Sequence, residues 1–87
     1  MQEALITFSN GETLKIKEGQ YLVPISRAEF KDEIFASQYE HYEVYNHIHD
    51  GLIPSLTSLV CQHDFFRLLD NVDIVYKTSS IVSIKNL

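Results

Sequence analysis

Apolar and polar residues alternate near the start of the chain, with the period of β-strands that bury one face. Residues 4–17 predict a hairpin that turns at Ser9-Asn10-Gly11. A two-residue Asn-Gly loop would set apolar residues against polar ones. A three-residue loop keeps one apolar face and places Gly11 where a left-handed residue is needed, so we expect this register: Ile6 opposite Leu14 and Ala4 opposite Ile16.

The next apolar run, Tyr21–Ile25, predicts a short strand, and its Pro24 favours an edge position because proline has no N–H to donate to a ladder. Ser26-Arg27-Ala28-Glu29 has the spacing of a capping box, with Ile25 and Phe30 at the positions of a hydrophobic staple. We therefore expect a helix from Ser26 to about Gln38 or Glu40. Its buried stripe would contain Phe30, Ile34, Phe35, Tyr39 and Tyr42.

From His41 to His49 the period returns to two, which predicts a strand with Tyr42, Val44 and Ile48 inward, ended by Asp50-Gly51. Pro54 fits the first turn of a short helix that closes near His63. Three further strands are expected at Phe65–Leu69, Val72–Tyr76 and Ile81–Ile84.

These elements predict a small single α+β domain over residues 1–87. Its mainly antiparallel sheet would have five or six strands, with one longer and one short helix, in the order ββ(β)αβαβββ. The last three strands could equally form part of a small barrel.

Composition narrows the class of protein. The 87 residues include 45% apolar residues and one cysteine, Cys61, which cannot form an internal disulfide. A reducing cytoplasm is therefore the expected compartment. The acidic N-terminus does not resemble a signal peptide, and no apolar run approaches the length of a membrane span, so we expect no membrane contact.

The net charge of −5 is concentrated in one part of the chain. Residues 29–50 hold six acids and one base, Lys31, whereas the remainder holds six of each. The bases are scattered, which argues against nucleic-acid binding. The same segment carries Tyr39, Tyr42 and Tyr45, a residue type enriched in protein interfaces.

Two groups of residues could carry chemistry. His47 and His49 would share one strand face, with Asp50, Cys61 or His63 as further metal ligands, but no CxxC or HExxH motif fixes such a site. On a helix, His63 would point away from Cys61 unless the chain turned between them, which argues against their use as a base and a nucleophile. We expect Cys61 to be buried and structural. Asp32 and Glu33 are expected on the solvated face of the predicted helix.

The leading hypothesis is a non-enzymatic interaction or regulatory module without a cofactor, which binds a protein partner, possibly a basic one, through residues 29–50. Its surface would comprise Asp32, Glu33, Glu40, Glu43, Tyr45, His47 and His49. Because free histidine titrates near pH 6.5, binding to a basic partner should weaken from pH 7.5 to about 5.5 and with added salt. The alternatives are a metal-binding protein or metal-dependent enzyme built on His47 and His49, and a homodimer formed through exposed strand edges.

Overall fold

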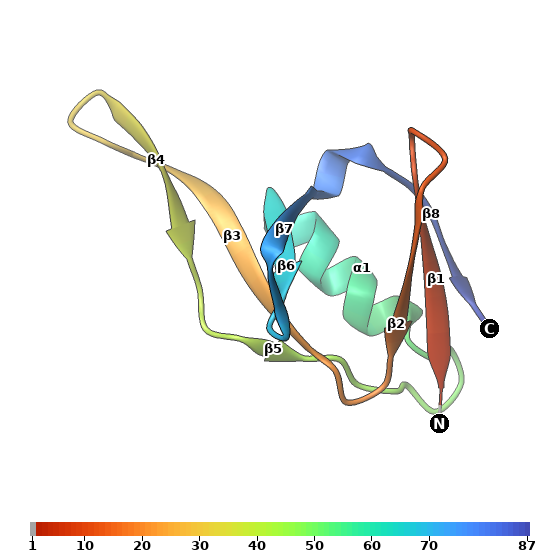
Figure 1. The fold of residues 1–87 in the computed structure, drawn as a ribbon. Helices are drawn as coiled ribbons and strands as arrows, with labels where there is room; N and C mark the ends of the chain where they lie inside the picture. Colours follow the sequence, from red (N-terminus) through yellow and green to blue (C-terminus); the bar gives the residue numbers. More distant parts are fainter. Residues whose placement is uncertain (1) are drawn as a thin grey trace.

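A computed structural model describes residues 2–87 (Figure 1). This part of the chain forms eight strands, one α-helix and a short 3-10 helix. In order they are β1 (Glu3–Phe8), β2 (Thr13–Lys17), β3 (Tyr21–Phe30), β4 (Glu33–Gln38), β5 (Tyr42–Glu43), α1 (Ile53–Gln62), β6 (Phe65–Leu68), β7 (Asn71–Lys77), η1 (Thr78–Ser80) and β8 (Ile81–Asn86). The chain is thus a small α+β protein dominated by antiparallel strands, as expected in outline.

The strands form two sheets. One has the order β2-β1-β8 and the other the order β4-β3-β6-β7, with β5 also paired to β3. The predicted first hairpin is confirmed: Ile6 lies opposite Leu14 and Ala4 opposite Ile16, and Gly11 has a φ of +88°. The last three predicted strands are present as β6, β7 and β8, but they do not lie in one sheet, because β7 pairs with β6 and β8 pairs with β1.

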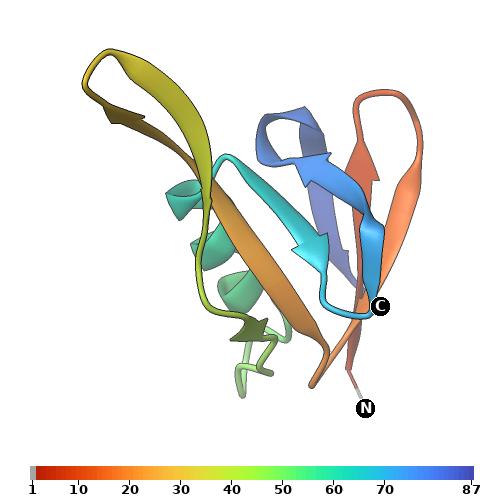
Figure 2. The same ribbon diagram turned by 60° about the vertical axis from the view of Figure 1, so that its left-hand side comes forward.

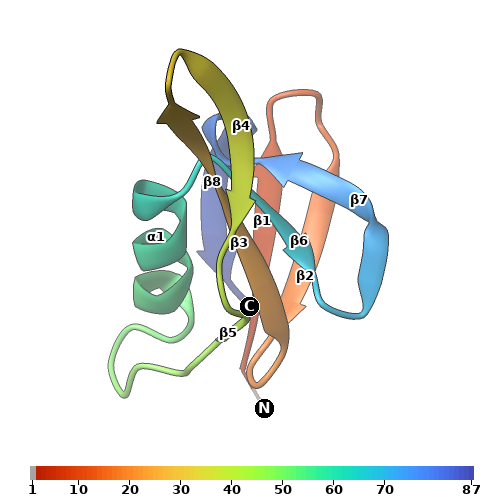
Figure 3. The ribbon, with the colours of Figure 1, turned by 90° about the vertical axis from the view of Figure 1, so that its left-hand side faces the viewer.

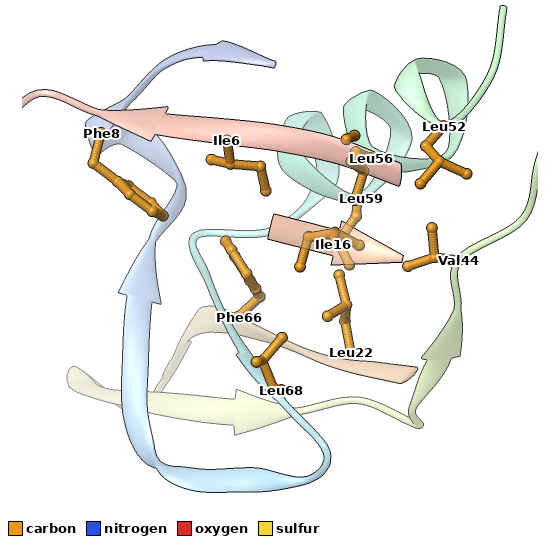
Figure 4. Packing of buried hydrophobic residues seen from close by; sticks show 11 residues of the cluster. Ile6, Phe8, Ile16, Leu22, Val44, Leu52, Leu56, Leu59, Phe66 and Leu68 are labelled. Carbon is orange, nitrogen blue, oxygen red and sulfur yellow. The ribbon is translucent and has the colours of Figure 1, made fainter. Parts of the chain in front are cut away.

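One hydrophobic core joins the two sheets and the helix (Figure 4). Strands β1, β2, β3 and β6 contribute its buried side chains, together with Val44 and residues of α1, which closes one side of the space between the sheets (Figures 1 and 3). Each large apolar side chain buried here stabilises the fold by about 1.5–3 kcal/mol. The largest fully buried ones are Phe66, Ile6, Ile16, Leu22, Leu52 and Leu56.

The short helix is confirmed. Pro54 lies in its first turn, Leu56 and Leu59 are buried on one face, and the chain becomes extended again at His63. Within residues 2–87, no helix is long and apolar enough to cross a membrane.

The longer helix predicted from Ser26 to Gln38 or Glu40 is wrong. This segment is a β-hairpin in which β3 continues to Phe30 and β4 returns from Glu33 (Figure 1). The apolar stripe that indicated a helix is not buried, since Phe30 is 64% exposed and Ile34 60% exposed. In place of capping a helix, the Ser26 side chain contacts His63.

The edge position predicted for Tyr21–Ile25 is also wrong, because β3 lies between β4 and β6. Pro24 is tolerated there because its missing N–H falls at a gap in the ladder. Pairing between β3 and β4 ends at Ile25 and Gln38, and pairing with β5 begins only at Leu22. The Pro24 carbonyl still accepts a hydrogen bond from the Tyr39 amide at 2.9 Å.

The strand predicted from His41 to His49 is confirmed only at Tyr42–Glu43. Tyr42 and Val44 do face inward, but Ile48 is 86% exposed and was placed wrongly. The chain turns away from the sheet after β5, so strict alternation ends there.

Candidate functional site

The acidic segment, residues 29–50, runs through two structural parts that we name here. The arm is the part of the β3–β4 hairpin formed by residues 26–37, and it extends past the ends of the neighbouring strands (Figure 2). The connecting segment is residues 39–51, which leads from the arm to α1. All six acids are exposed: Glu29, Asp32, Glu33, Glu40, Glu43 and Asp50.

The arm turns at Lys31 and Asp32, a two-residue loop in which both residues have positive φ, +51° and +67°. These are the signs of a type I′ turn, whose twist matches that of the flanking strands. Glycine and asparagine adopt this conformation more readily than lysine does. The turn therefore carries little sequence signal, which explains why the hairpin was not predicted.

The base of the arm is held by the corner between α1 and β6. Ser26 Oγ lies 2.8 Å from His63 Nδ1, and the Arg27 amide donates to the Asp64 carboxylate at 2.6 Å. The rings of Tyr39 and His63 pack edge-to-face, with their centroids 4.9 Å apart. These contacts join the arm to the body on the side of the sheet that faces α1.

A second contact spans the other face of β3. The guanidinium of Arg67, on β6, donates to Gln38 Oε1, on β4, at 2.6 and 3.2 Å. Arg67 is opposite Val23 and Gln38 is opposite Ile25, so the pair bridges over β3, where both of these apolar residues are buried.

Beyond its base, the arm exposes apolar side chains. Phe30 and Ile34 are largely in solvent, and Phe35 is 49% exposed. A hollow on the arm is lined by Ile34, Phe35, Ala36, Arg27 and, from β6, Phe65. An apolar projection of this kind is typical of a surface that contacts another protein.

The connecting segment is fixed to α1 through Ser55. The Tyr42 hydroxyl donates to the Ser55 carbonyl at 3.0 Å and lies 2.9 Å from its hydroxyl, which also accepts from the Tyr45 amide at 3.2 Å. Partial burial raises the pKa of Tyr42 above its ordinary value, although the Ser55 hydrogen bond opposes this shift. Ser55 is itself fully buried, so these bonds satisfy its polar groups.

Glu43 is engaged at the surface. A hydrogen bond to its carboxylate, together with the negative charge, raises the pKa of Tyr21, which lies opposite Glu43 in the sheet. The ring of His41 packs edge-to-face against the Tyr21 ring, with the two centroids 5.1 Å apart. Glu43 therefore belongs to a small surface cluster at β5 and does not continue a long strand.

His47 and His49 lie in a loop that closes on itself through hydrogen bonds between His47 and Gly51 in both directions. His47 Nδ1 accepts from the His49 amide at 3.3 Å and lies 3.5 Å from the Asp50 carboxylate. The predicted surface residues Tyr45, His47 and His49 are all exposed, but they do not share one strand face with Glu43.

The metal-site alternative is not assembled by this geometry. Across residues 2–87, no three His, Cys, Asp or Glu side chains are grouped so that they could hold a metal ion. His63 is occupied by Ser26 and Tyr39 at the base of the arm. Cys61 was expected to be buried but is exposed, because it lies on the solvent side of α1 with its thiol directed at the Ser58 carbonyl.

Ser26 and His63 have the separation of a nucleophile and its base, but the rest of a catalytic triad does not follow. The nearest carboxylate along the chain, Asp64, accepts from the Arg27 amide and does not orient the imidazole. We therefore assign the pair a structural role. Its position could not be found from sequence, because Ser26 and His63 are brought together only by the packing of α1 against the sheet.

Comparison with protein-family models, curated proteins and solved structures finds no match to this chain.

Proposed function

We propose that this protein is an interaction module without catalytic activity of its own, and that it binds a basic protein partner through the acidic segment. The observation that carries the proposal is the exposure of all six acids on an arm and a connecting segment that face solvent over most of their length. Residues 29–50 contain these six acids and only one base, so the segment would attract a positively charged surface.

Aromatic residues supply the contact area that charge alone does not. Tyr39 and Tyr45 are about half exposed, and both belong to the connecting segment that carries Glu40, Glu43 and Asp50. Tyrosine loses little conformational entropy on binding and can both pack and donate a hydrogen bond. The surface would therefore combine attraction at long range with a few specific contacts.

The experiment is affinity purification of the tagged protein followed by mass spectrometry, comparing two charge reversals of equal size. The variant Glu40→Lys/Glu43→Lys alters the connecting segment. The control Glu12→Lys/Asp73→Lys alters two exposed acids outside it and gives the same net charge. We expect one salt-sensitive partner to be retained by the wild type and the control but lost by the first variant.

Loss of the partner from both variants would mean that net charge alone matters and would contradict the assignment to this segment. Retention by both would show that the contact lies elsewhere. Circular dichroism of each variant establishes that the fold is intact before the comparison is made.

A further inference from the structure

We propose that the arm also pairs with the arm of a second copy of this chain, through the free edge of β4, to form a two-fold symmetric dimer. This inference goes beyond the proposed function, because it uses the backbone edge of the arm and leaves Glu40, Glu43 and the rest of the connecting segment free.

The free edge of β4 has a defined set of backbone groups. The Tyr39 amide donates to Pro24 on β3, and in an antiparallel strand every second residue bonds to the same neighbour. The backbone N–H and C=O groups of Glu33, Phe35 and Ser37 therefore point toward β3. Ile34, Ala36 and Gln38 present their N–H and C=O groups to the open edge, where another strand could add.

This edge is also less protected than the other strands that end the two sheets, β2, β7 and β8. Strand β8 carries Lys85, and a register shift interrupts its pairing with β1. Strand β2 carries Lys15 and Lys17, which discourage pairing with another strand, and β7 is bent by an irregularity in its pairing with β6. Strand β4 contains no proline or basic residue and has one charge, Glu33. Its register with β3 is continuous from Glu33 to Gln38.

A second copy fits the edge in one register better than in its neighbours. If Phe35 lies opposite Phe35 of the second copy, Ile34 pairs with Ala36 and Glu33 with Ser37, so that apolar residues meet apolar ones and polar residues meet polar ones. In this register Ile34 and Ala36 exchange the backbone hydrogen bonds that are otherwise free. Centring the pair on Ala36 would set Ile34 against Gln38 and Asp32 against Glu40, two acids.

At each end of the paired arms, an acid of one copy would lie near an arginine of the other. The register centred on Phe35 brings the tip residue Asp32 alongside Gln38 of the second copy, whose side chain already holds the guanidinium of Arg67. Ile34 of the second copy would lie next to Ala36, at the rim of the hollow lined by Phe35 and Phe65. Each arm would thus cover apolar surface that the other leaves exposed.

Disulfide trapping tests the edge and the register together. In a background of Cys61→Ser, which removes the exposed native thiol, cysteine is introduced at Phe35, Ala36 or, as the control on the other sheet edge, Val75. We expect Phe35→Cys to form a disulfide-linked dimer at least tenfold faster than Ala36→Cys or Val75→Cys, because non-hydrogen-bonded partners bring their Cβ atoms closest.

Sedimentation equilibrium of the unmodified protein accompanies the trapping, and we expect twice the mass of one chain. If the protein still had the mass of one chain at concentrations up to about 1 mM, the weak limit for a small interface, the proposal would be overturned. Faster trapping at Val75, or equal trapping at all three positions, would overturn the β4 edge, and faster trapping at Ala36 would overturn the register. A monomer that still retains its salt-sensitive partner would refute the dimer and leave the proposed function standing.

Discussion

Gly51 lies directly against the side-chain amide of Asn86, so closely that a Cβ atom on Gly51 would come within 2.6 Å of Asn86 Oδ1. The same amide donates to the Asp50 carbonyl at 2.8 Å and accepts from the Leu52 amide at 3.1 Å. The end of β8 thus fixes the loop that contains His47 and His49 just before α1 begins. The position of these two histidines depends on Asn86, which follows Gly51 by 35 places in the chain.

Gly51→Ala should therefore destabilise the protein. Its φ of +67° is unfavourable for alanine, and the new Cβ atom would displace the Asn86 amide from both partners. Together these effects should lower the free energy of unfolding by about 2–3 kcal/mol. Equilibrium urea unfolding measures the change. In an Asn86→Ala background the same substitution should cost only about 1 kcal/mol, and equal costs in the two backgrounds would contradict the steric explanation.

A substitution in the turn of the arm should instead stabilise the protein. Replacing Lys31-Asp32 with Asn-Gly supplies the residues that a type I′ turn prefers, and should raise the free energy of unfolding by about 1 kcal/mol. Thermal unfolding monitored by circular dichroism would show a higher Tm. As the matched control, Gly19→Ala at a φ of +85° should lower Tm. A lower Tm for the Asn-Gly variant would contradict the hairpin and revive a helix in this segment.

The sequence predicts the regular parts of the fold. The prediction is wrong where the spacing of apolar residues fits both a helix and a strand. In β1, β2 and α1, the local pattern agrees with the tertiary packing, so register and boundaries could be predicted. Between Ser26 and Gln38 the spacing of Ser26 and Glu29, and of Phe30 and Ile34, suits a helix, but in the structure these residues lie on a strand pair with Phe30 and Ile34 on opposite faces. No glycine or asparagine marks the turn between them.

The candidate site shows the same division. The location of the acidic segment follows from the distribution of charges along the sequence, and in the structure its six acids are exposed. The contacts that position it, Ser26 with His63, Gln38 with Arg67 and Tyr42 with Ser55, join residues distant in sequence. Such pairs depend on the packing of whole elements and leave no local pattern to detect.

The base of the arm can be loosened without disturbing the core. Ser26→Ala removes the partly buried hydrogen bond to His63 and should cost about 1 kcal/mol. Hydrogen exchange should then show less protection of amides in the arm and little change in β1. Ser79→Ala, at an exposed serine of η1, is the control. Equal loss of protection throughout the chain would mean that the arm and the body unfold together.

Alkaline pH should destabilise the protein through Tyr21 and Tyr42. Both pKa values are raised in the folded state, Tyr21 chiefly by its hydrogen bond to Glu43 and Tyr42 chiefly by burial. The folded state therefore holds these protons more tightly than the unfolded chain, whose tyrosines ionise near pH 10. The resulting stability is fully present below about pH 10 and is lost as the pH rises through the raised values.

Phenolate absorbance and urea unfolding from about pH 9 to 11 test this pH dependence. Glu43→Gln removes a negative charge and weakens the acceptor, so Tyr21 should ionise at a lower pH in this variant than in the wild type. Tyr42→Phe should instead reduce the loss of stability over the same range. If neither variant altered the alkaline transition, its origin would lie in other groups.

Self-pairing at Phe35 predicts a distinctive response to charge. In the proposed dimer Phe35 lies opposite itself, so Phe35→Lys and Phe35→Glu each place two like charges directly across the strands, and each variant alone should be monomeric. A mixture in equal amounts places lysine opposite glutamate and should recover a dimer that contains one copy of each. Native mass spectrometry distinguishes this mixed dimer from either pure one. The same exchange at Val75, on β7, should leave the wild-type dimer intact, and failure of the mixture to associate would exclude pairing across Phe35.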